Sequence, residues 1–344
     1  MAAVDWYHAL ERLQQEGIVE SFCVVPYLAR LNSSLTVDEI ADEVVAGAHE
    51  VRADIVLWAH TQGLHSAANC AARLRSVGVA AIGYWDGDWY HPYRNPFPGE
   101  CLALCSVSDV AFVQGDGLLV GLLHRAGCED VRYVPASTDD RFVAQPARSE
   151  YDWDLVMIGN RISSRLPFKD MPGAILRRKL VRMFERRLGN RFAVFGHGWT
   201  GASAQGPVDY EKQAEAYGLG IASLGCNNWF TRYYFSDRLP IAMASARPSI
   251  YYQGEGYDEV FGSDAGVFWY RDLDTAWKQF LAVSADPDAA LERAERARNI
   301  AVSGFTTYRT LIYMLDVLAA HADAETQGVA VRPVPNPWIS RSTL

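Results

Sequence analysis

Glycines with charged or aromatic neighbours follow several apolar runs in the second half of the chain. The candidate binding residues there are Gly159, Asn160, Arg161, Arg165, Gly196, His197, Gly198, Trp199, Asn228, Ser236, Asp237, Arg238, Glu255 and Glu259. Glycine lets a backbone approach a ligand closely, arginine neutralises phosphate charge, and carboxylates accept pairs of hydroxyls. These residue types therefore favour a phosphorylated ligand that carries hydroxyls. Each segment taken alone also fits an ordinary turn with solvated side chains.

Two of these segments have a more specific expected geometry. Ser236 or Asp237 is a suitable N-cap, and Pro240 suits the first turn of the helix that follows. The N-terminus of that helix would offer backbone N–H groups to an anion, and Arg238 adds a full positive charge. The segment 196–199 would let a ligand ring stack beside backbone amides.

The elements that must position these residues alternate between strands and helices. Strands are predicted at 21–26, 54–58, 79–83, 109–113, 131–135, 154–158, 192–195, 219–224, 249–252 and 267–270. Helices are predicted at 6–15, 37–51, 66–77, 117–126, 174–188, 238–246, 272–282, 288–301 and 306–321. This alternation predicts an α/β protein with parallel sheets covered on both faces, which bind ligands at the carboxyl ends of their strands.

The length of 344 residues exceeds what one core usually needs, so we expect two domains. A polar, proline-containing stretch at 144–153 suits the linker between them. We therefore expect an N-terminal Rossmann-like domain at 1–148 and a C-terminal Rossmann-like domain at 149–322. The proline-rich segment 323–344 is expected to be an extended tail on the surface.

Composition excludes several classes of protein. With 49% hydrophobic and 21% charged residues the chain has the balance of a folded globular protein. A formal charge of −9 argues against a global nucleic-acid footprint. The absence of a long apolar run and of a basic, apolar leader favours a cytoplasmic protein without a membrane span. Six cysteines without a Cys-x-x-Cys pair predict buried thiols, and neither they nor the eight histidines suggest a metal site.

A cluster of basic residues lies on the helix predicted at 174–188. Its members are Arg177, Arg178, Lys179, Arg182, Arg186 and Arg187. Because apolar residues at helical spacing occupy the other face, we expect most of these side chains to face water. The alternative is a local contact to an anionic acceptor, nucleic acid included.

Three segments in a fixed order carry a resemblance to a known family. DLVMIGN at 154–160, RFAVFGHGW at 191–199 and SDRLPIAMASARP at 236–248 resemble the C-terminal half of group 1 glycosyltransferases. The spore-maturation-like subgroup is the most similar. Segments 254–261, 267–273 and 298–308 agree with this pattern, and 80–86 and 131–142 match the first half more loosely.

The resemblance implies a GT-B fold, in which two Rossmann-like domains face each other across a cleft. It implies a hexosyltransferase-like enzyme that moves a sugar from a UDP-, GDP- or dTDP-linked donor to an acceptor hydroxyl, with no metal or other cofactor. The donor would lie on the C-terminal domain and the acceptor (a small molecule, a protein or a nucleic acid) on the N-terminal one. Two alternatives remain open, namely a nucleotide-sugar epimerase and a sugar- or partner-binding protein that has lost catalysis.

The sequence departs from the family at two places. Many group 1 enzymes carry Glu-x7-Glu across the helix that here begins near Arg238, and the matching first position is Ile241. Glu255 or Glu259 would then serve the second position, and the stereochemical course stays open. The chain also lacks an apolar strand and a glycine turn before Trp6, so we expect a rebuilt acceptor side.

Candidate groups on the acceptor side follow the strands of the first half. Asp86 and Asp88 are the preferred general bases, followed by His60 and His65, with Gln62 between the histidines. Four aromatic residues could stack on an acceptor ring, namely Trp85, Trp89, Tyr90 and Tyr93. The alternatives are aspartates that cap a turn and aromatic rings that pack at a domain edge.

Overall fold

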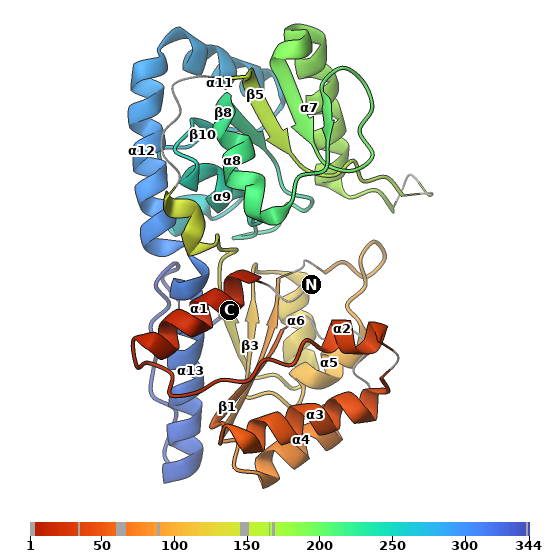
Figure 1. The fold of residues 1–344 in the computed structure, drawn as a ribbon, viewed down its shortest axis with the longest axis vertical. Helices are drawn as coiled ribbons and strands as arrows, with labels where there is room; N and C mark the ends of the chain where they lie inside the picture. The colour runs from red at the N-terminus through yellow and green to blue at the C-terminus, as the bar shows by residue number, and fades with distance from the viewer. Residues whose placement is uncertain are drawn as a thin grey trace. The chain divides into compact units, whose positions relative to one another are not determined.

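The computed structural model describes residues 4–33, 35–59, 67–87, 90–144, 151–164, 166, 169–341 and 343–344. The chain forms two compact units (Figure 1). Unit 1 combines Met1–Pro135 with Thr307–Leu344, and unit 2 is the continuous segment Ala136–Thr306. This division differs from the expected one, because the helix predicted at 306–321 packs on the first sheet and not on the second.

Unit 1 contains one parallel sheet in the order β1-β2-β3-β4. Its strands are β1 (Ile55–Ala59), β2 (Ala81–Asp86), β3 (Val110–Val113) and β4 (Asp130–Tyr133). All four were predicted. The strand predicted at 21–26 is wrong: this segment is irregular, and its Cys23 and Val24 are exposed rather than buried in a sheet.

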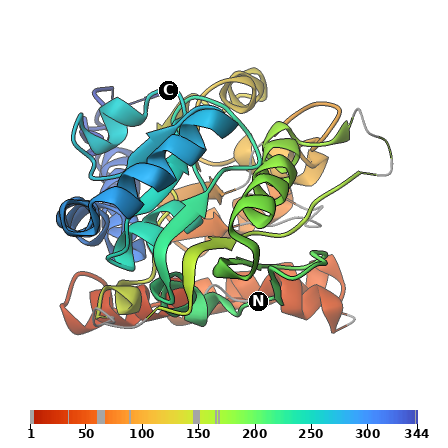
Figure 2. The same cartoon turned by 90° about the horizontal axis from the view of Figure 1, so that it is seen from above.

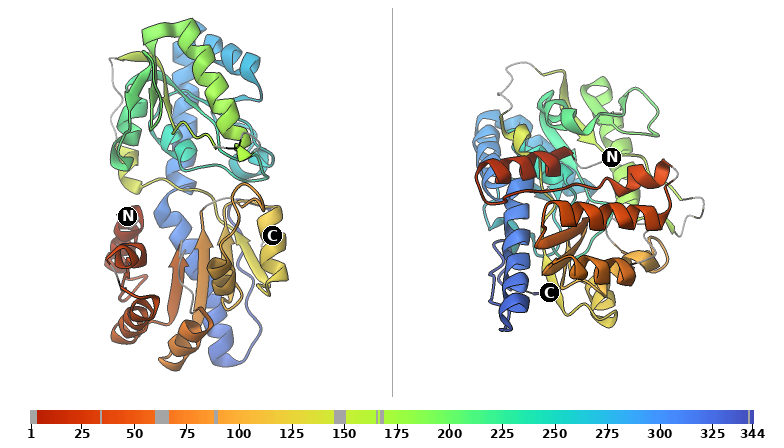
Figure 3. Two further views of the ribbon diagram at one scale, coloured as in Figure 1. Left: turned by 90° about the vertical axis from the view of Figure 1, so that its right-hand side faces the viewer. Right: turned by 60° about the horizontal axis from the view of Figure 1, so that its bottom comes forward.

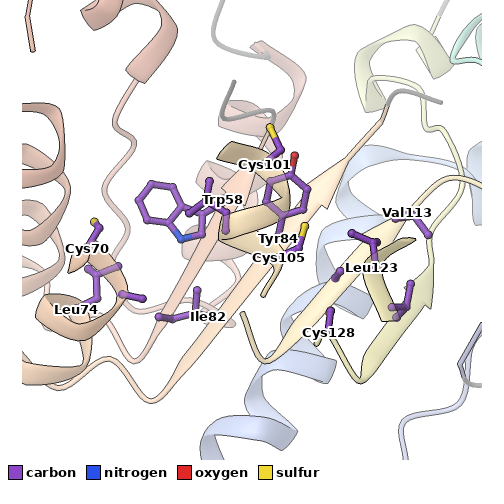
Figure 4. Packing of buried hydrophobic residues seen from close by; sticks show 14 of the residues in the cluster. Trp58, Cys70, Leu74, Ile82, Tyr84, Cys101, Cys105, Val113, Leu123 and Cys128 are labelled. Carbon is purple, nitrogen blue, oxygen red and sulfur yellow. The ribbon is translucent and has the colours of Figure 1, made fainter. Parts of the chain in front are cut away.

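Helices cover both faces of the unit 1 sheet. The helices of its N-terminal part are α1 (Val4–Gln15), α2 (Tyr27–Asn32), α3 (Val37–Glu50), α4 (Ala67–Ser76), α5 (Gly99–Cys105) and α6 (Leu118–Arg125). Residues of α3 to α6 pack with Trp58, Ile82 and Tyr84 on one face (Figure 4). Helix α13 (Thr307–Gln327) covers the other face and runs alongside the strands (Figure 3).

The cysteines of unit 1 fill this core as small apolar groups. Cys70, Cys101, Cys105 and Cys128 are fully or almost fully buried, and Figure 4 shows Cys101 and Cys105 beside Tyr84. Burial raises the pKa of the Cys101 thiol to about 11. The expectation of buried thiols is confirmed for these residues and is wrong for Cys23, which is exposed.

The segment after α13 is extended and is held against β4. Val334 and Trp338 are buried, and the side-chain N–H of Asn336 donates to Tyr133 O at 2.8 Å. The backbone N–H of Leu344 donates to Val131 O at 2.9 Å. The segment therefore covers part of the otherwise open edge of the sheet.

Unit 2 contains a second parallel sheet in the order β10-β9-β8-β5-β6-β7. Its strands are β5 (Trp153–Ile158), β6 (Phe192–Phe195), β7 (Ala204–Gly206), β8 (Gly220–Gly225), β9 (Ser249–Tyr252) and β10 (Phe268–Tyr270). The short polar edge strand β7 was not predicted. Chain order runs outward in both directions from β5 and β8, so the boundary between these strands is the topological switch point where such sheets bind ligands.

The helices of unit 2 lie on opposite faces of its sheet. They are α7 (Pro172–Leu188), α8 (Gln213–Gly218), α9 (Arg238–Ala244), α10 (Tyr257–Phe261), α11 (Leu273–Ala285) and α12 (Pro287–Gly304). Leu155 and Met157 of β5 pack with α7 and α11, which lie side by side in Figure 2. Val156 and Ile158 point the other way, toward α8 and α9.

Among the described residues, no helix combines the length and the apolar character that crossing a bilayer requires.

Candidate functional site

Four loops follow neighbouring strands at the carboxyl edge of the unit 2 sheet. Strands β9, β8, β5 and β6 lie side by side and run parallel, so their carboxyl ends share one edge. The loops carry Glu255, Asn228, Gly159 and Gly196 in that spatial order. The structure thus brings the predicted binding segments together, apart from Arg165, which lies outside the described residues.

The loops after β5 and β6 stay paired beyond the strands. Arg161 N donates to His197 O at 2.9 Å, and Asn160 Oδ1 accepts from His197 N at 2.9 Å. At Gly196 φ is 140°, and a Cβ there would lie 2.5 Å from Gly159 O. Glycine is therefore required where these two loops meet.

Trp199 belongs to the packing of these loops. Its indole N–H donates to Gly159 O at 2.6 Å, and its ring packs against the core under α7. The groups exposed at this end of the edge include Asn160, Arg161, His197 and Gly198. We conclude that a ligand ring here would meet backbone and these exposed groups rather than the Trp199 face.

Arg177 on α7 is a buried cation beneath the loop after β5. The residue is 2% exposed, so its expected position on a solvated helix face is wrong. Its Nη1 donates to Asn160 O at 2.9 Å and its Nη2 donates to Cys226 O at 3.2 Å, which ties the ends of β5 and β8 together. A Cβ on Gly159 would lie 3.0 Å from Arg177 Nε.

The charge of Arg177 is not neutralised by the protein residues that the structure describes. Its acceptors are carbonyl oxygens, no described carboxylate pairs with it, and its Nε is buried without a hydrogen-bond partner. A buried cation of this kind favours an anion nearby. One feature of the sequence could have indicated that Arg177 is buried: it continues the apolar stripe of Val181, Phe184 and Leu188 at helical spacing.

The rest of the basic cluster on α7 behaves largely as expected. Arg178 is half-buried and donates to Asp170 Oδ2 at 2.5 Å. The exposed members are Lys179, Arg182, Arg186 and Arg187. The prediction that most of this cluster faces water is therefore confirmed.

Asn227 organises the loop between β8 and α9. Its Nδ2 donates to Tyr257 OH at 2.6 Å and to Tyr234 O at 3.2 Å. Its Oδ1 accepts from Tyr251 OH at 3.0 Å and from Ser236 N at 3.1 Å. Both ends of the amide are thereby occupied, so Asn227 positions the loop.

The start of α7 packs closely on this loop. Gly173 N donates to Asn228 O at 2.9 Å, and a Cβ on Gly173 would lie only 1.6 Å from Asn227 O. The side-chain Oδ1 of Asn228 is buried and has no donor among the described residues. Asn228 thus presents an unused acceptor at the switch point.

The start of α9 differs from the anion site that we expected there. Asp237 caps the helix and accepts from Arg238 N at 3.0 Å, and Ser236 N donates to Asn227 Oδ1. Helix α9 has only seven residues, and its first amides are partly occupied by these protein acceptors. The positive charge here therefore comes from the Arg238 side chain rather than from the helix end.

Arg238 lies among tyrosines at the same edge. Its Nε is buried without a hydrogen-bond partner in the described chain, and its Nη1 is 3.8 Å from Asp237 Oδ1. Burial alone would lower the pKa of Arg238, but Asp237, Tyr217 and Tyr251 together raise it. The side chain consequently stays charged.

Tyr217 on α8 was not singled out in the sequence analysis. Its hydroxyl is buried and has no partner among the residues described, and burial raises its pKa. Arg238 and Arg177 act against that rise, so both cations lie near this hydroxyl. Nothing in the sequence pattern distinguished Tyr217 from an ordinary core tyrosine.

The two candidate carboxylates after β9 have different surroundings. Glu255 is exposed, while Glu259 is half-buried and accepts from Tyr233 OH at 2.7 Å. Arg232 Nη2 also approaches Glu259 Oε2 at 3.4 Å. Ile241, at the position of the absent family glutamate, is fully buried against α8, where a carboxylate would be costly.

On unit 1, Asp86 ends β2 and is 5% exposed. Tyr84 OH donates to its Oδ2 at 2.9 Å, and burial keeps the pKa of Tyr84 far above its usual value, so this phenol stays protonated. Asp86 is therefore a buried, hydrogen-bonded carboxylate and not a solvated turn residue. The other predicted bases and their neighbour, Asp88, His60, His65 and Gln62, lie outside the described residues.

The aromatic residues near Asp86 are divided between packing and exposure. Trp85 packs on Trp6 at 4.8 Å between ring centroids, and Tyr90 packs edge-on against Phe97 at 6.1 Å. Tyr93 is 78% exposed, and Trp89 lies outside the described residues.

In the described chain, no group of three or more His, Cys, Asp or Glu side chains could hold a metal ion.

Comparison with known proteins identifies a domain type within the chain. Residues 177–316, less than half of the chain, match a family model described as glycosyl transferase-like. This segment runs from within α7 to the first half of α13. No protein of curated function matches the chain.

Several solved structures share the fold. HepE from Anabaena, solved with UDP and glucose, has a TM-score of 0.55 at 13% identity and covers 82% of this chain and 81% of its own. An α,α-trehalose 6-phosphate synthase from Burkholderia multivorans has a TM-score of 0.53 at 11% identity, with coverages of 86% and 77%. TarM has a TM-score of 0.54 at 10% identity and covers 80% of this chain, which spans only 58% of TarM.

These likenesses establish the architecture. They confirm the expected α/β fold class, a GT-B fold built from two Rossmann-like domains with parallel sheets. The chain thus carries a glycosyl transferase-like domain on a GT-B fold, with a buried arginine, Arg177, and a half-buried one, Arg238, at the switch point of its second sheet.

Proposed function

We propose that the protein is a group 1 glycosyltransferase of the spore-maturation-like subgroup. It transfers a hexosyl group from a nucleotide sugar to an acceptor hydroxyl without a bound metal. The UDP and UDP-glucose complexes of HepE support a UDP-linked donor, and GDP- and dTDP-linked donors fit the same site chemistry. The acceptor is a small molecule, a protein or a nucleic acid.

The observation that carries this proposal is the pair of arginines at the β5/β8 switch point. Arg177 and Arg238 each have a buried Nε without a partner in the described chain; Arg177 pairs with no described carboxylate, and Arg238 pairs with Asp237 at 3.8 Å. The unused Asn228 acceptor and the exposed Arg161 lie at the same edge. A diphosphate supplies the negative charge that this arrangement lacks.

In the proposed reaction the bond between the anomeric carbon and the diphosphate oxygen breaks. The acceptor oxygen forms the new glycosidic bond and gives up its proton, and the nucleoside diphosphate leaves with the bonding electrons. Negative charge develops on the diphosphate, so Arg177 and Arg238 stabilise the transition state more than the ground state. Asp86 is the described candidate for accepting the proton, with Asp88 and His60 as further candidates.

Thermal unfolding with a panel of nucleotide sugars tests the proposal. UDP-glucose, GDP-mannose and dTDP-glucose are added to the wild type, to Arg238→Ala and to the charge-matched control Arg182→Ala, whose side chain is exposed on α7. A ligand at 100 times its Kd stabilises by about 2.7 kcal/mol, or roughly 5–10 °C in Tm. We expect this rise in the wild type and in Arg182→Ala, and its loss in Arg238→Ala.

A turnover assay with the best-stabilising donor separates an enzyme from a binding protein. The wild type is expected to release the nucleoside diphosphate at the same rate with and without EDTA. The rate of release is expected to fall at least about 100-fold in Arg238→Ala. Binding without release would indicate a protein that has kept the fold and lost catalysis. An unchanged Tm with every donor would contradict the proposal, and loss of activity with EDTA would contradict metal independence.

A further inference from the structure

An aromatic pair with one exposed member lies at the same sheet edge, on the β9 side of the switch point. Phe230, in the loop after β8, is 41% exposed and stacks on Tyr252 at the end of β9. Their ring centroids are 4.3 Å apart and their planes differ by 26°. Tyr252 is in turn held edge-on by Tyr270 of β10. The pair is thus a flat, supported surface that faces solvent.

The loop that carries Phe230 is held in a costly conformation. Tyr233 has a φ of 66°, which is a strained value for a bulky residue. Its N–H donates to Glu255 O at 2.9 Å, and its OH donates to Glu259 Oε2. A Cβ on Gly256 would lie 2.5 Å from the Tyr233 ring, so glycine makes room for this arrangement. Strain retained in this way is typical of functional loops.

Polar residues lie on the chain segments next to the aromatic pair. Gln253 follows Tyr252 directly, and its Oε1 accepts from Arg271 Nε at 3.2 Å. Arg271 and Glu255 are both exposed. Amide, guanidinium and carboxylate groups beside a flat ring are the set that recognises a sugar, whose apolar face stacks and whose hydroxyls form hydrogen bonds.

We propose that the exposed face of Phe230 is the stacking surface for the sugar ring of the donor, with Gln253, Arg271 and Glu255 as partners for its hydroxyls. This inference rests on the proposed function. In this proposal the diphosphate lies at the arginines between β5 and β8, and the nucleoside lies on the β6 side, where the loops leave Arg161, His197 and Gly198 exposed. The sugar therefore extends the other way along the edge, toward β9.

Calorimetry on the full chain tests this inference. Three pairs of probes are used: UDP and UDP-glucose, GDP and GDP-mannose, and dTDP and dTDP-glucose. In the pair that binds, Phe230→Ala is expected to raise the Kd of the nucleotide sugar about five- to tenfold and to leave the Kd of the free nucleotide within about twofold. Phe230→Trp, which keeps a flat ring, is expected to retain wild-type affinity for both.

Two controls keep the result interpretable. Leu281→Ala removes an apolar side chain of similar exposure (47%) from α11 and is expected to change neither Kd. Because Phe230 lies at the surface, a Tm within a few degrees of the wild type is expected for Phe230→Ala. Equal Kd changes for nucleotide and nucleotide sugar, or no change in either, would overturn the stacking role and leave the proposed function intact. Failure of the wild type to bind any of the six probes would overturn both.

Discussion

At the scale of single residues, Arg177 has a structural role beside the functional one that we propose for it. Its two hydrogen bonds to carbonyl oxygens join the ends of β5 and β8, yet no described carboxylate pairs with its charge. Burying a cation in this way costs stability. Under the proposed function, a diphosphate bound beside Arg177 would offset that cost.

Replacing Arg177 by an apolar side chain of similar length tests this balance. We expect Arg177→Met to leave the free energy of unfolding unchanged or raised, and to weaken UDP binding at least about tenfold. Urea unfolding and calorimetry measure the two effects on the same variant. A large loss of stability with unchanged UDP affinity would assign Arg177 a purely structural role.

A second residue-scale prediction concerns Asp130 of β4. This carboxylate is largely buried, and it pairs with Arg132 and with His321 Nε2 at 3.0 Å. Burial alone would raise its pKa, but the hydrogen bonds from His321 and Arg132 lower it below its usual value. A lowered folded-state pKa stabilises the protein above about pH 4, and this stabilisation is lost as the pH falls through the folded pKa.

We therefore expect Asp130→Asn to lower the free energy of unfolding at pH 7 by about 3 kcal/mol. Its stability should also fall less than that of the wild type between pH 4 and pH 2. Urea unfolding at several pH values measures both effects. Asp42→Asn, which removes an exposed pair with Arg73, is the control and should cost less than about 1 kcal/mol. If the free energy of unfolding of Asp130→Asn falls as steeply with acid as that of the wild type, the Asp130 ion pairs are not the source of the pH dependence.

At the scale of elements, apolar runs and glycine positions were informative where a strand is buried on both faces. Strands β5, β6, β8 and β9 were predicted because burial on both faces demands a continuous apolar run. Glycines mark the loops after β5, β6 and β9 but not the loop after β8. The same reasoning missed β7, which is short, polar and at the edge. It also failed at 21–26, where apolar residues lie exposed outside any sheet.

The candidate site was predictable only in part, because side-chain partners depend on contacts distant in sequence. The positions of Gly159 and Gly196 followed from strand ends. The burial of Arg177 depends on the approach of α7 to the loop after β8, more than forty residues away along the chain. The hydrogen bonds of Asn227 depend on residues up to thirty positions away, such as Tyr257. The local sequence pattern does not predict that approach of α7.

This approach of α7 gives an element-scale prediction. A Cβ on Gly173 would lie 1.6 Å from Asn227 O, so Gly173→Ala must displace the start of α7 or the loop after β8. We expect a loss of at least about 2 kcal/mol in the free energy of unfolding, together with weaker UDP binding. Gly218→Ala, also in a helix of unit 2 and with nothing within 4 Å of the added Cβ, should be neutral or slightly stabilising. Equal stabilities of the two variants would contradict the packing described.

At the scale of the whole molecule, unit 1 is assembled from two separate stretches of sequence. Leu318 of α13 packs over Gly83 of β2, and Tyr313 packs against Phe112 of β3. The sequence does not mark this boundary with a linker, because Thr307 begins a helix that follows α12 after only two residues, Phe305 and Thr306. Unit 2, by contrast, is one uninterrupted segment.

Fragments of the chain test this difference. We expect 136–306 to unfold cooperatively on its own, since its core uses no residue from elsewhere. The fragment 1–148 lacks the cover of α13 on one sheet face and should remain aggregated or only partly folded. Joining 307–344 to 1–135 through a flexible linker should restore a cooperative transition by circular dichroism. A stable, monomeric 1–148 would show that α13 is dispensable.

The return of the chain to unit 1 at Thr307 has a consequence for biosynthesis. A ribosome finishes the four strands of the first sheet and then translates the 171 residues from 136 to 306 before α13 can emerge. At about 5–20 residues per second this interval lasts on the order of ten to thirty seconds. During that time the nascent first sheet has one apolar face bare, while the segment behind it can already fold. The later-synthesised unit is therefore the first to be completed, and the first sheet is the part of the newborn chain that a chaperone must shield.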